Sequence, residues 1–164
     1  MKLISGRFFR ILFDRDEAFI LRGAAAPEGR YHHDGQKALY MSPDAGWAWN
    51  AAKVHARSGN QAPFVQQLIV QRAYVVDIRD AAACDMLGIS SADSDVPWQP
   101  QLLTGQRPST WNISDKARAV GADGLIYTAR TAPYRWHLVL FRWNQDGDPA
   151  VMARQLSAYS PPAS

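Results

Sequence analysis

The chain has 164 residues, of which 47% are hydrophobic and 20% charged, and this indicates one globular domain rather than a disordered chain. The net charge of +3 comes from basic residues spread along the sequence, so we expect no direct nucleic-acid binding. No apolar run reaches the roughly 20 residues of a membrane helix. The N-terminus lacks the apolar core of a signal peptide, and Cys84 is the single cysteine, so we expect a cytoplasmic protein without membrane contact.

The hydrophobic pattern predicts short strands and helices in an irregular order. Strands are predicted over 7–13, 18–22, 37–42, 64–70, 73–78, 124–128 and 136–143. Helices are predicted over 43–57, 80–87 and 112–121. Because strands and helices do not alternate regularly, we expect a single α+β domain with a mixed, mostly antiparallel sheet and flanking helices.

The ends of the elements carry recognisable signals. Ser42 is a plausible cap for the helix that follows, with Pro43 and Asp44 in its first turn. Residues 90–101 are rich in Ser, Asp and Pro, which predicts a long loop of the kind that often binds ligands. The domain is expected over residues 1–145, with a partly flexible tail over 146–164.

The stretch from Gly29 to Ser42, GRYHHDGQKALYMS, gathers polar groups at a strand end. It holds one arginine, two tyrosines, two histidines and a serine within a few residues of a predicted strand. Strand ends and the loops that leave them are where binding sites are usually built. A surface hairpin whose polar side chains face water would use the same residues, so both interpretations remain open.

Several catalytic motifs are absent from the sequence: GxGxxG, the Walker loop, HExxH, CxxC and GxSxG. His32 and His33 are adjacent, whereas His55 and His137 are distant in sequence, so the histidines do not predict a metal site. A dehydrogenase, a P-loop enzyme and a classical serine hydrolase are therefore disfavoured. A metal-free site of arginine, tyrosine, histidine and hydroxyl groups remains.

With these residues in view, the chain resembles the RES family of bacterial toxins, which is named for an arginine, a glutamate and a serine. The matching segments follow the family's order and span most of the chain: FFRIL at 8–12, GRYHHDG at 29–35, ALYMSPDAGWAW at 38–49, YVVDI at 74–78, ARAVGADGLIYTAR at 117–130 and HLVLF at 137–141. The family arginine falls on Arg30 and the aromatic residue after it on Tyr31. A second arginine falls on Arg10, and the strand tyrosine on Tyr40.

The resemblance implies an ADP-ribosyltransferase-like fold that takes NAD as substrate and breaks its nicotinamide–ribose bond without a metal. It also implies an Xre-type helix-turn-helix antitoxin that blocks the site. We expect a toxin that transfers ADP-ribose to a bacterial protein. Depletion of NAD by hydrolysis or phosphorolysis is the alternative, and a non-catalytic NAD-binding module is a second one.

Two positions depart from the family pattern. The family glutamate should lie near Trp49 or Asn50, where this chain has no acid. The family serine should follow Tyr127, where the chain has Thr128 and Ala129. Thr128 could supply the missing hydroxyl, and hydrogen bonds from a neutral side chain could replace the carboxylate.

The resemblance and the residue types together give an expected site. Guanidinium groups suit the diphosphate, aromatic rings can stack on nicotinamide, and a hydroxyl can bind the amide or the ribose. The residues expected to bind NAD are Arg10, Arg22, Arg30, Tyr31, Tyr40, Ser42 and Trp47. Those expected to act in catalysis are Arg30, Tyr40, Asn50, His55 and Thr128. A core position accounts equally well for Trp47, and a solvent-facing helix position is the simpler interpretation of His55.

Overall fold

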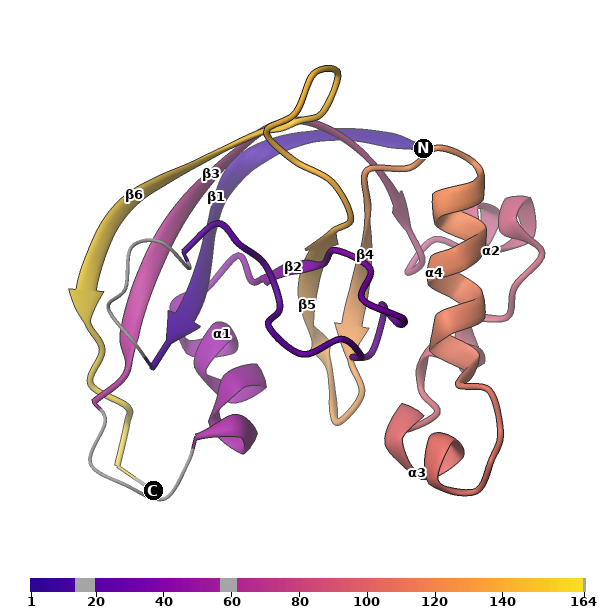
Figure 1. Ribbon diagram of the computed structural model, residues 1–164, viewed down its shortest axis with the longest axis horizontal. Coiled ribbons are helices and arrows are strands. Elements are labelled where there is room, and N and C mark those ends of the chain that lie inside the picture. Colours follow the sequence, from indigo (N-terminus) through magenta and orange to yellow (C-terminus); the bar gives the residue numbers. More distant parts are fainter. Residues whose placement is uncertain (14–19, 57–61, 164) are drawn as a thin grey trace.

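The computed structural model describes residues 1–13, 20–56 and 62–163. They form a mixed six-stranded sheet with flanking helices (Figure 1), which confirms the predicted single α+β domain. The elements in chain order are β1 (Lys2–Leu12), β2 (Leu39–Met41), α1 (Ala45–Ala52), the 3-10 helix η2 (Lys53–His55), β3 (Phe64–Asp77), α2 (Ala81–Leu87), the 3-10 helix η3 (Ser91–Ser94), α3 (Trp98–Leu103), α4 (Ser109–Ala119), β4 (Gly124–Ala129), β5 (Ala132–Leu140) and β6 (Ala150–Ala158).

The long strand β3 joins two halves of the sheet. It pairs antiparallel with β1 over most of its length and antiparallel with β6 over residues 64–71. Its last three residues, Val75 to Asp77, pair parallel with Gly124 to Ile126 of β4. From β4 the sheet continues antiparallel through β5 to β2. The β1–β3–β6 half and the β4–β5–β2 half are therefore linked by one short parallel seam.

Alternating side chains of β4 enter two separate cores, as expected for a strand covered on both faces. Ile126 packs with the β1–β3–β6 half, in the core that contains Phe8 and Leu68. Leu125 and Tyr127 face the second core, which α2 and α4 cover. Within the described residues, no helix is both long and apolar enough to cross a membrane.

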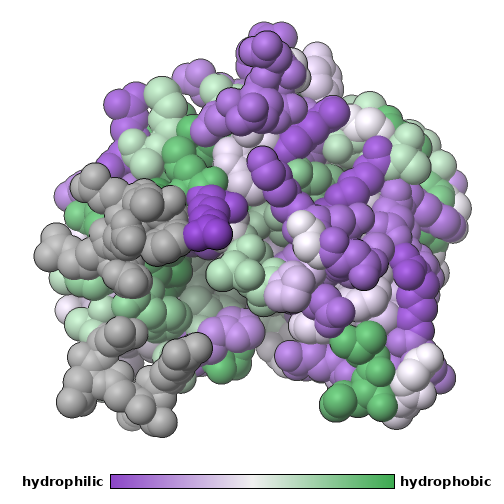
Figure 2. All heavy atoms as spheres, viewed as in Figure 1, coloured by the Kyte–Doolittle hydropathy of each residue, from purple (hydrophilic) through white to green (hydrophobic). Residues whose placement is uncertain are grey.

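The surface in Figure 2 is mostly hydrophilic over the α4 side of the molecule and more hydrophobic over the β1–β3–β6 side. A small apolar patch lies at α3, where Leu102 and Leu103 are exposed.

The helix predicted over 43–57 is shorter and has another cap. α1 begins at Ala45, and the side chain of Asp44 accepts a hydrogen bond from the main-chain N–H of Trp47. The prediction that Ser42 is the cap is wrong, because Ser42 is extended and forms a main-chain bridge with Phe9. α1 ends at Ala52 and continues as η2 only to His55.

Other boundaries also differ from the expectations. The two strands predicted over 64–78 are one strand, β3, which accommodates Arg72 at a positive φ of 59°. Residues 20–22 lie in a turn and not in a strand, and residues 18–19 lie outside the described residues. The expected loop over 90–101 contains η3 and the start of α3. Residues 150–158, expected within a partly flexible tail, form β6 against β3.

Candidate functional site

Arg30 lies over two neighbouring aromatic rings near the end of β4. Its guanidinium carbon lies 5.2 Å from the centre of the Tyr31 ring and 5.0 Å from that of Tyr127. Nη1 donates to the main-chain oxygen of Thr128 (3.2 Å), and Nη2 donates to that of Ser94 (2.6 Å). In the described part of the chain, no carboxylate forms an ion pair with Arg30. Three of its five N–H donors thus remain available for an anion.

Tyr31 is completely buried beneath this arginine. Its ring centre lies 4.6 Å from that of Tyr127, and its hydroxyl has no hydrogen-bond partner among the described residues. Burial raises its pKa well above the ordinary value, the charge of Arg30 opposes this, and the nearby charge of Asp95 adds to it. Tyr31 therefore stays a neutral phenol that supports the guanidinium.

A tight bridge places Arg30. The N–H of Gly29 donates to the main-chain oxygen of His32 (2.9 Å), so the chain turns back immediately around the arginine. Gly29 is required here, because a Cβ atom would lie 2.3 Å from Cε1 of His32. The sequence therefore folds locally around a residue that lacks a side chain.

The hydroxyl of Tyr40 holds this bridge from β2. It accepts the N–H of Tyr31 (2.9 Å) and lies 2.8 Å from Nδ1 of His32. Nε2 of His32 donates to the main-chain oxygen of Ala26 (2.9 Å), which can only accept, so Nδ1 of the neutral ring accepts a hydrogen bond from the Tyr40 hydroxyl. Burial also raises the pKa of Tyr40. Tyr40 thus positions the Arg30 segment, and its hydroxyl is already fully engaged.

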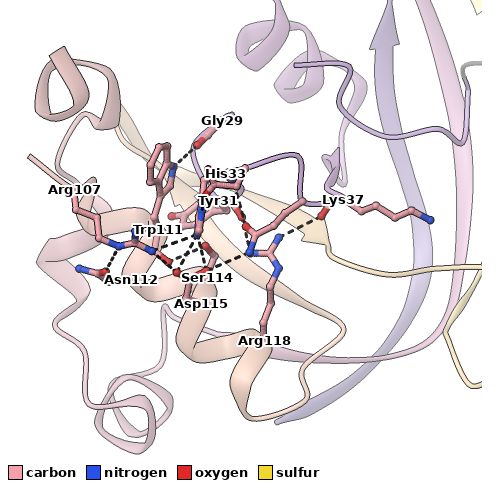
Figure 3. A network of polar contacts seen from close by, with 12 residues as sticks. Gly29, Tyr31, His33, Lys37, Arg107, Trp111, Asn112, Ser114, Asp115 and Arg118 are labelled. Carbon is pink, nitrogen blue, oxygen red and sulfur yellow. Dashed lines mark hydrogen bonds and ion pairs between the residues drawn. The ribbon is translucent and has the colours of Figure 1, made fainter. Parts of the chain in front are cut away.

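Helix α4 also fixes the Gly29–Tyr31 segment, through two side-chain hydrogen bonds to its main chain (Figure 3). Nε1 of Trp111 donates to the main-chain oxygen of Gly29 (2.8 Å), and Nη1 of Arg118 donates to that of Tyr31 (3.1 Å). These two bonds hold the residues immediately before and after Arg30. The guanidinium is therefore mounted on a segment that is tied to both the sheet and a helix.

His33 forms the outer part of this attachment. Its ring stacks on Trp111 with a centre-to-centre distance of 4.9 Å, and its Nε2 contacts the carboxylate of Asp115 (2.8 Å). Its Nδ1 contacts Asp34 (2.6 Å), and Arg107 also pairs with Asp115. Two carboxylates and the Arg107 guanidinium therefore surround this ring and hold it against α4.

Ser42 and His137 form a buried pair on the sheet face that also carries Tyr127. The Ser42 hydroxyl lies 2.6 Å from Nδ1 of His137, and the two residues are only 2% and 5% exposed. Burial, together with the smaller effect of the positive charges of Arg30 and Arg135, lowers the pKa of His137 from 6.5 to about 4. His137 is therefore neutral near pH 7, and it is a weak base.

This shift predicts a pH dependence of stability. Between pH 6.5 and about 4 the unfolded chain binds a proton at residue 137 more readily than the folded protein, so acidification favours unfolding. The full stabilisation is present above pH 6.5 and is lost as the pH falls to about 4, with a size on the order of 3 kcal/mol. Denaturant unfolding at several pH values should show a shallower decline for His137→Asn than for the wild type.

The exposed His55 provides the control for this measurement. His55→Asn should follow the wild-type decline closely. If His137→Asn also followed it, the buried neutral state of His137 would be contradicted.

Arg10 and Arg22 do not share the Arg30 arrangement. Arg10 donates to the main-chain oxygens of Ile20 (2.8 Å) and Gly23 (3.2 Å), and burial lowers its pKa to about 10. It anchors the short stretch over residues 20–23. Arg22 lies exposed in the turn of that segment.

The expected residues of the 43–57 region are engaged around α1. Nδ2 of Asn50 donates to the main-chain oxygen of Gly46 (2.9 Å), and its Oδ1 accepts from Lys53. Trp47 makes an edge contact with Tyr134 at 6.5 Å, and His55 is exposed in η2. The described hydrogen bonds of Asn50 thus stay within this helical region.

Thr128 meets Arg30 through its main chain and not through its hydroxyl. It lies directly opposite Trp136, so its side chain shares the sheet face of Trp136, whereas Tyr127 and His137 share the Arg30 face. Tyr127 and His137 did not appear among the expected site residues. Side chains alternate between the two faces of a sheet along each strand. Tyr127 and His137 could therefore be assigned to the Arg30 face only once the register between β4 and β5 was known.

Within the described residues, no group of three or more His, Cys, Asp or Glu side chains is placed to hold a metal ion. The arrangement around Arg30 instead offers a guanidinium backed by two buried aromatic rings. Chemically it suits an anionic ligand.

Comparison with known proteins places these observations in context. The model of the RES domain family matches residues 7–159, which extends past the expected domain end at residue 145. The fold is similar to a chain in the crystal structure of the M. tuberculosis MbcT–MbcA toxin–antitoxin complex, with a TM-score of 0.67 and 16% sequence identity over 97% of this chain and 86% of that chain. Among curated protein sequences, none matches this chain significantly.

Proposed function

Because the chain belongs to the RES domain family, we propose that it is a toxin that cleaves the nicotinamide–ribose bond of NAD and transfers ADP-ribose to a bacterial protein. The observation that carries this proposal is Arg30, whose guanidinium lies over the rings of Tyr31 and Tyr127 and keeps three N–H donors that no described residue occupies. A guanidinium without a carboxylate partner suits the diphosphate of NAD. Arg30 is also the residue that aligns with the arginine of the family motif.

Cleavage of the nicotinamide–ribose bond needs little acid–base catalysis from the protein. As the C1′–N bond breaks, its electron pair stays on the pyridine nitrogen, nicotinamide leaves neutral, and positive charge develops on the ribose. The protein must hold the diphosphate and keep the reacting centre oriented toward its acceptor. We assign the first task to Arg30 and propose that the hydrogen-bonded pair of Ser42 and His137 binds a hydroxyl or amide of the substrate.

Transfer to a protein is favoured over hydrolysis by the weakness of the available base. Activation of water needs a base with a pKa near the working pH, and the pKa of His137 is about 4. α1 carries no acid where the family glutamate is expected, and Asn50 bonds within its own helical region. A protein side chain that is already a good nucleophile would avoid the need for a base.

The partner we propose is an antitoxin of the Xre helix-turn-helix type that covers the Arg30 segment. The structural neighbour is described as part of a toxin–antitoxin complex, and the similarity of fold supports a related partner here. We place this proposed interaction, like the proposed activity, in the cytoplasm and assign no metal to either.

Release of nicotinamide from NAD tests the proposal. The purified protein is incubated with NAD labelled in the adenylate half, first alone and then with a bacterial lysate. We expect release in the presence of lysate together with label on a protein band. Rapid release without lysate and without labelled protein would instead show hydrolysis or phosphorolysis. Release no higher than that of heat-inactivated protein under both conditions would leave only the non-catalytic binding module.

A further inference from the structure

Arg135 is a second guanidinium on the Arg30 side of the sheet. Tyr127 and His137 lie directly opposite each other across β4 and β5. Arg135 precedes His137 by two residues on β5, beside an irregularity in the β4–β5 register at Thr128 and Ala129. Its charge acts on His137, as does that of Arg30. Arg135 therefore lies close to the pair of Tyr127 and His137, and Arg30 covers the Tyr127 ring.

Arg135 has no protein partner for its charge in the described part of the chain. Its Nε atom is buried without a hydrogen-bond partner, and its one described contact is with the ring of the adjacent Tyr134, at 5.2 Å. Buried donors are normally satisfied, so this orphaned N–H calls for an explanation. The charges of Arg30 and Arg135 both act on His137 and lower its pKa after burial has done so. Two guanidiniums therefore converge on one small region.

Two like charges close together, neither paired with a carboxylate, favour an anion that can bind both. A single carboxylate would satisfy one guanidinium fork. A diphosphate offers oxygens on two neighbouring phosphorus atoms and carries enough charge for two forks. Arg10 cannot serve as the second arginine in this way, because it shares the face of β1 with Phe8, which packs in the other core, and it donates to the main chain of residues 20 and 23.

We propose that Arg135 acts with Arg30 to bind a diphosphate, each guanidinium holding one phosphate. The inference rests on the proposed function for the identity of the dinucleotide that carries this group. It adds Arg135 as the residue that selects a diphosphate over a monophosphate.

Isothermal titration with two probes, pyrophosphate and ADP-ribose, tests this assignment. Arg135→Ala should bind both probes at least about tenfold more weakly than the wild type, as expected for loss of a charge-assisted hydrogen bond. Arg154→Ala is the matched control, since it removes the same charge from an exposed position on β6 and should bind like the wild type. Arg135→Gln removes the charge while keeping a long polar side chain, and it should also bind weakly. It serves as the second variant if Arg135→Ala fails to fold.

The outcomes separate this inference from the proposed function. Pyrophosphate binding that depends on Arg135, in a protein that neither binds nor consumes NAD, would support the diphosphate site and refute the NAD proposal. Unchanged binding of both probes by a folded Arg135 variant would overturn the assignment of Arg135, whatever the activity on NAD. Failure of the wild type to bind either probe would overturn it as well.

Discussion

Replacement of Arg30 by alanine is expected to abolish nicotinamide release and toxicity. The substitution removes the guanidinium that the proposed function assigns to the diphosphate, and loss of such a charge-assisted bond costs about 1.5–3 kcal/mol of binding free energy. Affinity for ADP-ribose should therefore fall at least about tenfold. Stability should fall more modestly, because Arg30 also donates to the main-chain oxygens of Thr128 and Ser94.

Two further variants define this experiment. Arg30→Lys keeps the charge but loses the planar fork, so it should retain only part of the activity. Arg154→Ala, which removes an exposed arginine of β6, should release nicotinamide like the wild type. Wild-type activity in a folded Arg30→Ala protein would sink the assignment of Arg30 to the substrate.

Replacement of Gly29 by alanine is expected to lower the stability of the folded protein. The added Cβ would lie 2.3 Å from Cε1 and 2.7 Å from Nδ1 of His32, a side chain that is itself fixed by Ala26 and Tyr40. Forced repacking of this kind costs about 1–3 kcal/mol, so the melting temperature should fall by roughly 2–12 °C. Nicotinamide release should fall too, because Arg30 is the next residue.

Gly6→Ala provides the matched control for this substitution. A Cβ at Gly6 would meet only Cε2 of Phe8, at an ordinary 3.8 Å. Thermal unfolding of the two variants should therefore differ clearly. Equal melting temperatures for Gly29→Ala and the wild type would mean that His32 can move aside and that the bridge at Gly29 does not fix Arg30.

The sequence predicted the fold class and most of the elements, because those follow from hydrophobic periodicity. It failed where a partner distant in the chain decides the structure. Ser42 has the chemistry of a helix cap, yet its bridge to Phe9 draws it into the sheet and leaves the cap to Asp44. The sequence of β6 resembles a polar tail because most of its side chains are exposed. It forms a strand because it pairs with the edge of β3.

The candidate site shows the same limit. Arg30, Tyr31 and Tyr40 are close together in sequence, and a short-range motif could single them out. The role of Tyr40 could not be predicted, since it depends on hydrogen bonds to the main chain of Tyr31 and the ring of His32. Tyr127 and His137 could be added only from the register between β4 and β5. Sequence spacing alone does not contain that register.

The acceptors that hold Arg30 have a consequence for how this chain can diverge. Both are main-chain oxygens, at residues 94 and 128, and every amino acid carries such an oxygen. Side chains at these two positions can therefore drift without removing the anchor, provided that η3 and β4 keep their backbone paths. A chain with Thr128 and Ala129 where the family serine is expected can still hold its arginine over the rings of Tyr31 and Tyr127. The position of the Arg30 guanidinium thus depends on the backbone at residues 94 and 128, and the residue that carries the hydroxyl near position 128 can change without moving it.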